Sequence, residues 1–354
     1  MSGWPDQRFL DLVGSEHPII QAPMANAGGV ELVAAAIAGG ALGSLACGIL
    51  SPSEIRDQAA QVRGRAKGPI NLNFFCHQMP EQFDDSAWRA LLEPYYRRFG
   101  ITPEPPGPLR LPFDAAACAM VEQVKPEVVS FHYGLPPQEL LDRVKANGAV
   151  ILSSATTVAE ARWLEQRGVD AVIAQGFEAG GHTGRFLGSD PSQAVGLFAL
   201  LPQVVDAVSV PVIAAGGIAD GRGIAAAFAL GASAVQIGTA YLLTPESLIA
   251  PEHKELLPGR PTVMTNLYSG GLARAAVGRL IEELGPVRDE APPFPLASAA
   301  IIPLWREAQR RGEWDWLLPL AGQSAALAER LPATQLTRKL AADALEMMGS
   351  PVDA

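Results

Sequence analysis

AVILSSATTVAEARWLEQRGVDAVIAQ, residues 149–175, has the pattern of a strand, a helix and a second strand in succession. The apolar runs 149–155 and 170–175 are almost continuous, which is typical of parallel strands covered on both faces. The amphipathic stretch 157–167 between them is followed by Gly168, a residue that commonly ends helices. This unit therefore predicts an α/β fold built on a parallel sheet.

The same unit recurs along the whole chain. Amphipathic stretches such as 137–147 and 221–230 separate the predicted strands. The eight predicted strands are 17–23, 41–47, 69–75, 127–133, 149–155, 170–175, 211–216 and 233–240. Because strand and helix alternate eight times, the pattern predicts a closed (β/α)8 barrel rather than an open doubly wound sheet.

Two long segments do not fit the repeating unit. A barrel of this type has about 250 residues, and we expect it to occupy residues 1–245 of the 354-residue chain. Residues 76–126, after the third strand, greatly exceed an ordinary connection of about 2 to 6 residues and predict an insertion. Residues 246–354 predict a helical C-terminal extension that packs on the barrel.

Composition excludes several classes of protein. A net charge of −10 has the wrong sign for a protein that binds a phosphate backbone, so nucleic acid is not an expected partner. The three cysteines are widely spaced and form no C-x-x-C pair, which predicts reduced thiols in a cytoplasmic protein. The apolar stretch 31–50 is long enough to span a bilayer, but Gly39 and Gly40 interrupt it. We therefore expect a helix, a turn and a strand there, and no membrane partner.

The predicted strand ends indicate where chemistry takes place. In such a barrel the reactive groups lie at the carboxyl ends of the strands and in the loops that follow. These positions carry amides, hydroxyls, histidines and glycines, and Glu178 is the only clear carboxylate. The pattern lacks the paired acids of a glycoside hydrolase and the ligands of a metal site. It suits a large, polar, planar cofactor approached by bare backbone.

Two glycine steps predict a phosphate site. Gly216–Gly217 follows the seventh predicted strand and Gly238–Thr239 follows the eighth, where barrels commonly hold a phosphate. The competing interpretation is that these glycines only serve tight turns. Residues 221–226 also fit the G-x-G-x-x-A fingerprint of a Rossmann dehydrogenase. That fingerprint belongs after a first strand, not a seventh, so we disfavour it.

Histidines supply the candidate acid–base groups. His182 follows the sixth predicted strand on a glycine-rich loop, and its ordinary pKa of about 6.5 suits proton abstraction near neutrality. A surface-loop histidine is the competing interpretation. His132 lies inside the fourth strand, where a packed or substrate-orienting role is as plausible as a catalytic one. His77 is undecided, and His17 and His253 are expected to be structural.

Taken together, these residues resemble a known family, the nitronate monooxygenases. The resemblance is carried by QAPM at 21–24, NLNFF at 71–75, QGFEAGGH at 175–182, AAGGI at 214–218, QIGT at 236–239, LYSG at 267–270 and AGQ at 321–323. It implies a TIM barrel that binds FMN and oxidises alkyl nitronates, with nitroalkanes as a further option. O2 would complete the conversion to a carbonyl compound and nitrite, and the cofactor would carry the redox step.

The resemblance also implies roles for individual residues. His182 corresponds to the family's catalytic base, while Asn71 and Gln175 would hydrogen-bond to the flavin. Ala22, Pro23 and Met24 would lie against the flavin ring. The remaining cofactor-binding positions, several of them at the phosphate, are Gly180, Gly181, Gly216, Gly217, Gln236, Ile237, Gly238 and Thr239.

Three positions depart from the family pattern. Thr183 follows the catalytic histidine where arginine is common, and Gly271 replaces the arginine of S-G-R-P-A-R. Asn26 replaces the glycine that usually follows Q-A-P-M-A. The first two changes remove a cation that an anionic nitronate would use, which leaves the substrate range open.

Two other functions remain as alternatives. A related flavin-dependent enoyl-acyl-carrier-protein reductase shares the barrel and a similar E-A-G-G-H loop but uses NAD(P)H, and a quinone reductase is of the same kind. A flavin-binding protein without turnover of its own is the alternative from another class. A small-molecule substrate with O2 is the expected partner set, and a homo-oligomer is left open.

Overall fold

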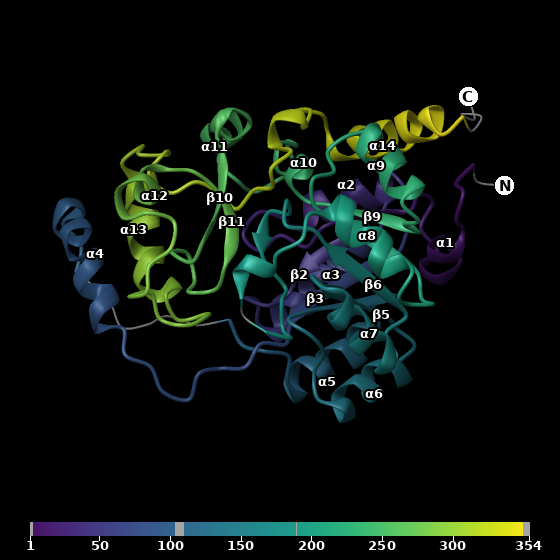
Figure 1. Ribbon diagram of the computed structural model, residues 1–354, viewed down its shortest axis with the longest axis horizontal. Coiled ribbons are helices and arrows are strands. Elements are labelled where there is room, and N and C mark those ends of the chain that lie inside the picture. Colours follow the sequence, from purple (N-terminus) through teal and green to yellow (C-terminus); the bar gives the residue numbers. More distant parts are fainter. Residues whose placement is uncertain (1–2, 103–109, 189, 350–354) are drawn as a thin grey trace.

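The computed structural model describes residues 3–102, 110–188 and 190–349 and contains a closed barrel (Figure 1). Its strands are β1 (Ile19–Gln21), β2 (Gly43–Ala46), β3 (Ile70–Phe75), β4 (Val128–His132), β5 (Val150–Ala155), β6 (Ala171–Gln175), β8 (Val212–Ala215) and β9 (Ala234–Ile237). Within the described residues these eight strands follow the order β1-β9-β8-β6-β5-β4-β3-β2, and every pairing is parallel. The Gln21 N–H donates to the Leu42 carbonyl at 2.9 Å, beside a parallel bridge between Ile20 and Leu42, and closes the ring. The predicted (β/α)8 barrel is confirmed.

Helices cover the outside of this sheet. They are α2 (Val30–Ala38), α3 (Pro52–Arg65), α5 (Ala115–Val124), α6 (Gln138–Ala146), α7 (Val158–Gln166), α8 (Leu197–Val205), α9 (Gly221–Ala229) and α14 (Ala333–Met347). Local sequence fixes where several of these helices begin. At the start of α3, the hydroxyl of Ser51 accepts from the Glu54 N–H, and the Glu54 carboxylate accepts from the Ser51 N–H. The short helix α1 (Arg8–Val13) places Phe9 and Val13 in a buried cluster with Ile20 of β1.

Helix α14 belongs to the barrel although a long segment after β9 separates it in sequence from the other barrel elements. Helix α14 packs against α9 and α2, and so closes the ring of outer helices (Figure 1). The hydroxyl groups of Tyr241 and Thr337 lie 2.7 Å apart in this contact. The sequence-based division at residue 245 assigned this helix to the extension, because a helix far from its strand in sequence carries no local mark of where it packs.

The apolar stretch 31–50 forms α2, a turn at Gly39–Gly40 and then β2, as predicted. Gly39 lies close to α14, since a Cβ added there would meet the Thr337 Cβ at 2.6 Å. None of the described helices has the length and apolarity needed to cross a membrane.

The segment between β9 and α14 forms a lobe beside the barrel. It contains α10 (Thr239–Leu242), α11 (Pro251–Leu256), η2 (Leu257–Gly259), β10 (Thr262–Thr265), β11 (Ala273–Ala276), α12 (Arg279–Leu284), α13 (Ser298–Arg310) and η3 (Ala325–Leu327). The sequence predicts a purely helical extension, and this is wrong, because the extension also contains strands β10 and β11. Strands β10 and β11 pair antiparallel, and β11 also pairs with β7 (Gly181–His182) from the loop after β6; η1 (Pro191–Gln193) follows in that loop. Strands of four residues leave too little periodicity to be recognised in sequence.

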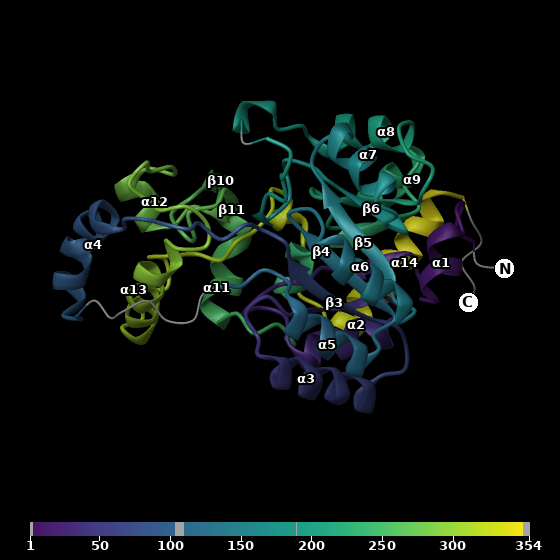
Figure 2. The same cartoon turned by 90° about the horizontal axis from the view of Figure 1, so that it is seen from below.

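The insertion predicted at 76–126 includes one helix of the barrel, α5, and only its earlier part packs on this lobe. Its helix α4 (Ser86–Phe99) lies along α13 in both views (Figures 1 and 2). Trp88 and Tyr96 are buried at the contact, and their side chains donate to the carbonyls of Ala297 at 3.2 Å and Ala300 at 2.7 Å. The insertion and the extension, far apart in sequence, thus share one hydrophobic core.

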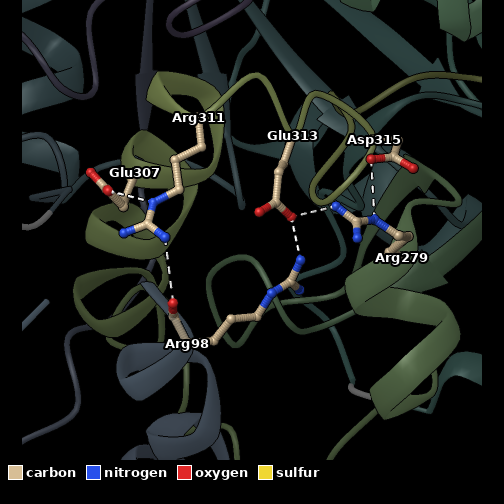
Figure 3. Close-up of polar contacts among 6 residues, drawn as sticks. All are labelled: Arg98, Arg279, Glu307, Arg311, Glu313 and Asp315. Atoms are coloured by element: carbon tan, nitrogen blue, oxygen red, sulfur yellow. Dashed lines mark hydrogen bonds and ion pairs between the residues drawn. The ribbon is translucent and has the colours of Figure 1, made fainter. Parts of the chain in front are cut away.

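Ion pairs fasten the rim of this contact (Figure 3). The Glu313 carboxylate accepts from Arg98 of α4 at 2.5 Å and from Arg279 of α12 at 2.6 Å. Arg311 donates to Glu307 at 2.8 Å and to the Phe99 carbonyl at 2.5 Å. Single exposed pairs contribute little to stability, but a shared carboxylate joins several segments at once. The end of α4 is thereby fixed against the lobe.

Candidate active site

A cavity of about 560 Å³ opens at the carboxyl ends of the barrel strands. Most of the residues predicted for the site line it: Ala22, Pro23, Met24, His132, Gln175, Gly180, Gly181, His182, Gly216, Gly217, Gln236, Gly238 and Thr239. They come from the ends of six strands, β1, β4, β6, β7, β8 and β9, or from the loops that follow them. The lobe covers the other side of the cavity with residues such as Ser269 and Trp305.

Two predicted cofactor residues lie outside the lining. Asn71 is fully buried, and its amide nitrogen donates to the Ser44 hydroxyl at 3.0 Å. Ile237 is also buried, at 1% exposure. Asn73 lines the cavity instead of Asn71, because residues two apart on a strand share a face and Asn73 lies nearer the carboxyl end.

His182 is held by main-chain pairing with the lobe. It lies on β7, opposite Ala273 of β11, so the glycine-rich loop is fixed at this point rather than free. Its Nε2 lies 2.7 Å from the hydroxyl of Ser269, and the residue is 8% exposed. Burial, and then the positive field of Arg110, lower the pKa of His182 well below its usual value. At neutral pH the imidazole is therefore uncharged and able to accept a proton.

The carbonyl of His182 receives two side-chain donors. Gln175 Nε2 donates to it at 2.9 Å, and His132 Nε2 lies 3.1 Å from it. A carbonyl only accepts, so His132 carries its proton on Nε2, and Nδ1 accepts from the Ser154 hydroxyl at 2.6 Å. Both nitrogens of His132 are thus occupied. Its burial lowers its pKa to about 4, which suits a neutral positioning group better than a base.

The other histidines differ in their places. His77 lies at the end of the cavity that holds His182, which we call the reactive end. Its ring is 4.7 Å from that of Phe294, and burial lowers its pKa to about 4. His253 lines the cavity, but its Nε2 is bound to the Trp314 carbonyl at 2.9 Å. His17 is outside the cavity lining, next to Trp4.

The buried histidines give the protein an acid-labile core. The pKa values of His77, His132 and His182 are lower in the folded state than in the unfolded chain. Protonation therefore favours the unfolded chain, and the free energy of unfolding decreases as the pH falls below 6.5. For His132 alone, a change from 6.5 to about 4 corresponds to about 3 kcal/mol lost by pH 4. We expect urea unfolding at a series of pH values to show a falling free energy of unfolding between pH 6.5 and 4.5. The variant His132→Gln should show a flatter profile, and equal stability at pH 7 and pH 5 would contradict the expectation.

The opposite part of the cavity presents bare backbone. The N–H groups of Gly180, Gly217 and Gly238 have no hydrogen-bond acceptor among the described residues, and all three glycines line the cavity. Gly217 has a left-handed φ of +70° that favours glycine. Close beside them, the Gln236 Oε1 is buried without a partner in the described chain. Free donors and an orphaned acceptor in one cavity fit a polar ligand that carries an anion.

The free N–H groups of Gly180, Gly217 and Gly238 form what we call the glycine cradle, and the lobe contacts this cradle directly. A Cβ on Gly180 would lie 2.5 Å from the Gly322 nitrogen, so glycine is required there by close contact between two backbones. The Gly322 N–H donates to the Thr239 hydroxyl at 2.9 Å, and the Gln323 N–H donates to the Glu178 carbonyl at 3.0 Å. Glu178 itself turns away, because its carboxylate accepts from the Leu197 N–H at the start of α8.

The dinucleotide fingerprint has a structural explanation. Gly221 and Gly223 lie in α9, outside the cavity lining. A Cβ on Gly221 would lie 2.5 Å from the Asp343 Cβ of α14, so the glycine serves helix packing. The Gly223 N–H donates to Asp220, which caps the helix.

Several site residues were not predicted. Ser269 was noted only as part of LYSG, and Arg110 lies in an irregular part of the insertion with no motif. The rings of Phe75 and Phe294 stand 6.1 Å and 5.1 Å from that of His182. Phe75 lies at the end of a predicted strand, so the sequence could have indicated it as a site residue. Phe294 lies outside every predicted strand, so the sequence carries no such signal for it.

The departure at Asn26 also has a physical explanation. Asn26 lines the cavity with a left-handed φ of 61°. This region favours glycine, and asparagine is among the residues that tolerate it best. The replacement therefore preserves the backbone turn after Met24.

Comparisons with known proteins agree with this geometry. The family model described as nitronate monooxygenase matches residues 6–343. A nitronate monooxygenase of Pseudomonas aeruginosa is 41% identical over 94% of this chain and 97% of its own length. One of Paraburkholderia phytofirmans is 40% identical over 94% of this chain and 93% of its own length.

Solved structures extend the comparison. The nitroalkane oxidase from Streptomyces ansochromogenes has a TM-score of 0.89 and 36% identity, covering 97% of this chain and 99% of that one. FabK from Thermotoga maritima has a lower TM-score of 0.73 and 30% identity, with 97% of each chain covered. The resemblance seen in the sequence is confirmed: this chain belongs to the nitronate monooxygenase family of flavin-dependent oxidoreductases.

Proposed function

We propose that this protein is an FMN-dependent oxidase of alkyl nitronates, and of neutral nitroalkanes, that uses O2 and yields carbonyl compounds and nitrite. The observation that carries the proposal is a buried, uncharged His182 facing the same cavity as a cradle of unpaired backbone donors. The relatives named nitronate monooxygenase and nitroalkane oxidase support the choice of substrate.

FMN fits the residues that are present. Gly180, Gly217 and Gly238 would donate to its phosphate, and Gln236 would place its buried acceptor against a polar group of the cofactor. Gly181, Gly216 and Thr239 line the same end, and Ala22, Pro23 and Met24 offer a largely apolar surface to the ring. The bound flavin would supply the electron acceptor, with O2 as the final oxidant.

His182 would act as the base on neutral substrates. Among the described residues its Nδ1 has no hydrogen-bond partner, while Nε2 is engaged with Ser269. With the proton of the neutral ring on Nε2, Nδ1 carries the lone pair that takes the α-proton of a nitroalkane, leaving the nitronate. A substrate that arrives as nitronate needs no such transfer.

Gln175 and His132 would act as positioning residues. Both bind the His182 carbonyl, so they hold the main chain that carries the base, and neither needs to exchange a proton. Asn71 would brace β2 from the layer below through its bond to the Ser44 hydroxyl, while its buried Oδ1 has no partner in the described chain. Ile237 would back the phosphate end with apolar contact.

Apolar rings would receive the rest of the substrate. Phe75 lines the cavity, and Phe294, which lines an adjoining pocket, lies 5.9 Å from it by ring centroids; each ring is near His182. Such surfaces bind an alkyl chain through burial and exclude water from the base. The site therefore suits small alkyl substrates with one polar end.

Removing the hydroxyl that orients the base should have a modest and selective effect. The variant Ser269→Ala loses the 2.7 Å contact to His182 Nε2, worth about 1 kcal/mol or about fivefold in rate. Steady-state kinetics should show this loss in kcat for a neutral nitroalkane and little change for its nitronate. Ser298→Ala is the matched control, because Ser298 also lines the cavity but bonds to the Pro295 carbonyl. An equal loss on both substrates would argue against the orienting role.

The proposed function is tested on the purified protein by absorbance and turnover. We expect a yellow protein with the two visible bands of an oxidised flavin, FMN as the extracted cofactor, and nitrite released from propyl-2-nitronate in air. Rapid NAD(P)H oxidation with an enoyl thioester or a quinone, and no nitrite, would instead identify a reductase. Bound FMN with no turnover of any of these compounds would identify a non-catalytic flavoprotein.

A further inference from the structure

Among the described residues that line the cavity, Arg110 carries the only permanently charged side chain. No other Lys, Arg, Asp or Glu is present among the described residues that line it. The guanidinium forms no ion pair with a carboxylate of the described chain, and burial lowers its pKa from the ordinary value. The neighbouring His77 and His182 have lowered pKa values too, so Arg110 is the lasting positive charge of the site at neutral pH.

The chain places Arg110 at the reactive end of the cavity. Three residues later, the Phe113 N–H donates to the Phe75 carbonyl at 2.8 Å, and the Phe113 ring packs 4.9 Å from that of Phe74. The guanidinium carbon lies 5.7 Å from the Phe75 ring centroid, and that ring is the one beside His182. The returning end of the insertion is thus tied to β3.

Arg110 stands apart from the glycine cradle. Its anchor strand β3 is separated from β8, which leads to Gly217, by β4, β5 and β6. The two ends of the cavity therefore present two anion sites across the barrel mouth. Gly217 and Gly238 of the cradle follow β8 and β9, whereas Arg110 lies by Phe75, the ring beside His182.

We propose that Arg110 binds the two oxygens of the substrate's nitro or nitronate group and so turns its α-carbon toward His182. The identity of the anion rests on the proposed function. A planar guanidinium donates to paired oxygens in a bidentate manner, as it does to carboxylates.

Arg110 is only partly exposed and has no carboxylate partner in the described chain, which has a predictable effect on stability. Desolvating a charge without a partner destabilises the folded state, and such groups are retained where function uses them. The variant Arg110→Met should therefore keep or raise the midpoint of thermal unfolding, whereas removal of a structural arginine would lower it. FMN content should stay that of the wild type, because the phosphate is held elsewhere.

The decisive experiment compares anion binding and turnover in the FMN-loaded protein. In Arg110→Met we expect KM for propyl-2-nitronate to rise roughly 10- to 100-fold, the worth of a charge-assisted hydrogen bond, with a smaller rise for 2-nitropropane. Arg110→Lys should recover part of the affinity, since it keeps the charge but not the fork. Arg56→Met, which removes an exposed charge from α3, is the matched control and should change neither value.

Nitrate, a planar anion that cannot react, gives a second measurement. It should raise the midpoint of thermal unfolding and perturb the flavin spectrum of the wild type, relative to chloride at equal ionic strength, and do neither in Arg110→Met. An unchanged nitronate KM in Arg110→Met, or nitrate effects equal in both proteins, would overturn the role of Arg110. A wild type that binds nitrate through Arg110 yet releases no nitrite from nitronates would instead contradict the proposed function alone.

Discussion

The variant His182→Gln should oxidise a neutral nitroalkane about 10²- to 10⁴-fold more slowly than the wild type, the range expected for loss of a general base. Glutamine keeps a polar group near Ser269 but cannot accept the α-proton at neutral pH. The same variant given pre-ionised nitronate should lose much less, because that substrate has already lost its proton. Steady-state oxygen consumption with both forms of one compound checks the difference.

The pH dependence of the wild type belongs to the same prediction. The base must be uncharged, and burial with the field of Arg110 lowers the pKa of His182 well below 6.5. Activity on a neutral nitroalkane should therefore fall only at pH values well below 6.5, and not near neutrality. Losses of equal size on nitroalkane and nitronate in His182→Gln would show that His182 has another role.

Gly238→Asp should abolish FMN binding. A carboxylate placed about 4 Å from a phosphate charge costs about 4 kcal/mol at an effective dielectric constant near 20, or about 10³-fold in Kd. It would also obstruct an N–H group that has no acceptor in the described chain. The purified variant should be colourless, and FMN titration followed by fluorescence should show at least this loss of affinity.

Gly238→Ala is the matched control for size. A Cβ there would contact the Ala22 Cβ at 3.5 Å and the Met24 sulfur at 3.8 Å, both ordinary distances, and the φ of −111° suits any residue. Alanine should therefore keep the fold and most of the bound FMN. A yellow, fully loaded Gly238→Asp protein would refute the placement of the phosphate beside this glycine.

The barrel was predictable because its signals are local. The unit at 149–175 already contains two strands and a helix, now β5, α7 and β6, and the alternation repeats in the same form. Strand ends then follow from strand positions, which is why His182 and the steps at Gly216 and Gly238 could be chosen. A left-handed turn such as that at Gly217 favours glycine, so positions of this kind also leave a mark in the sequence.

Contacts between segments that are far apart in the chain were decided only by the tertiary structure. Ser269 meets His182 across 87 residues, and α14 returns to close the ring between α9 and α2. Helix α4 joins the lobe through Trp88 and Tyr96, and Arg110 reaches the cavity from an irregular segment. Periodicity reports which face of an element is buried but not which partner buries it. The partner is chosen by the fit of side chains in the folded molecule, and that choice gave His182 its neutral form and placed Arg110 at the cavity.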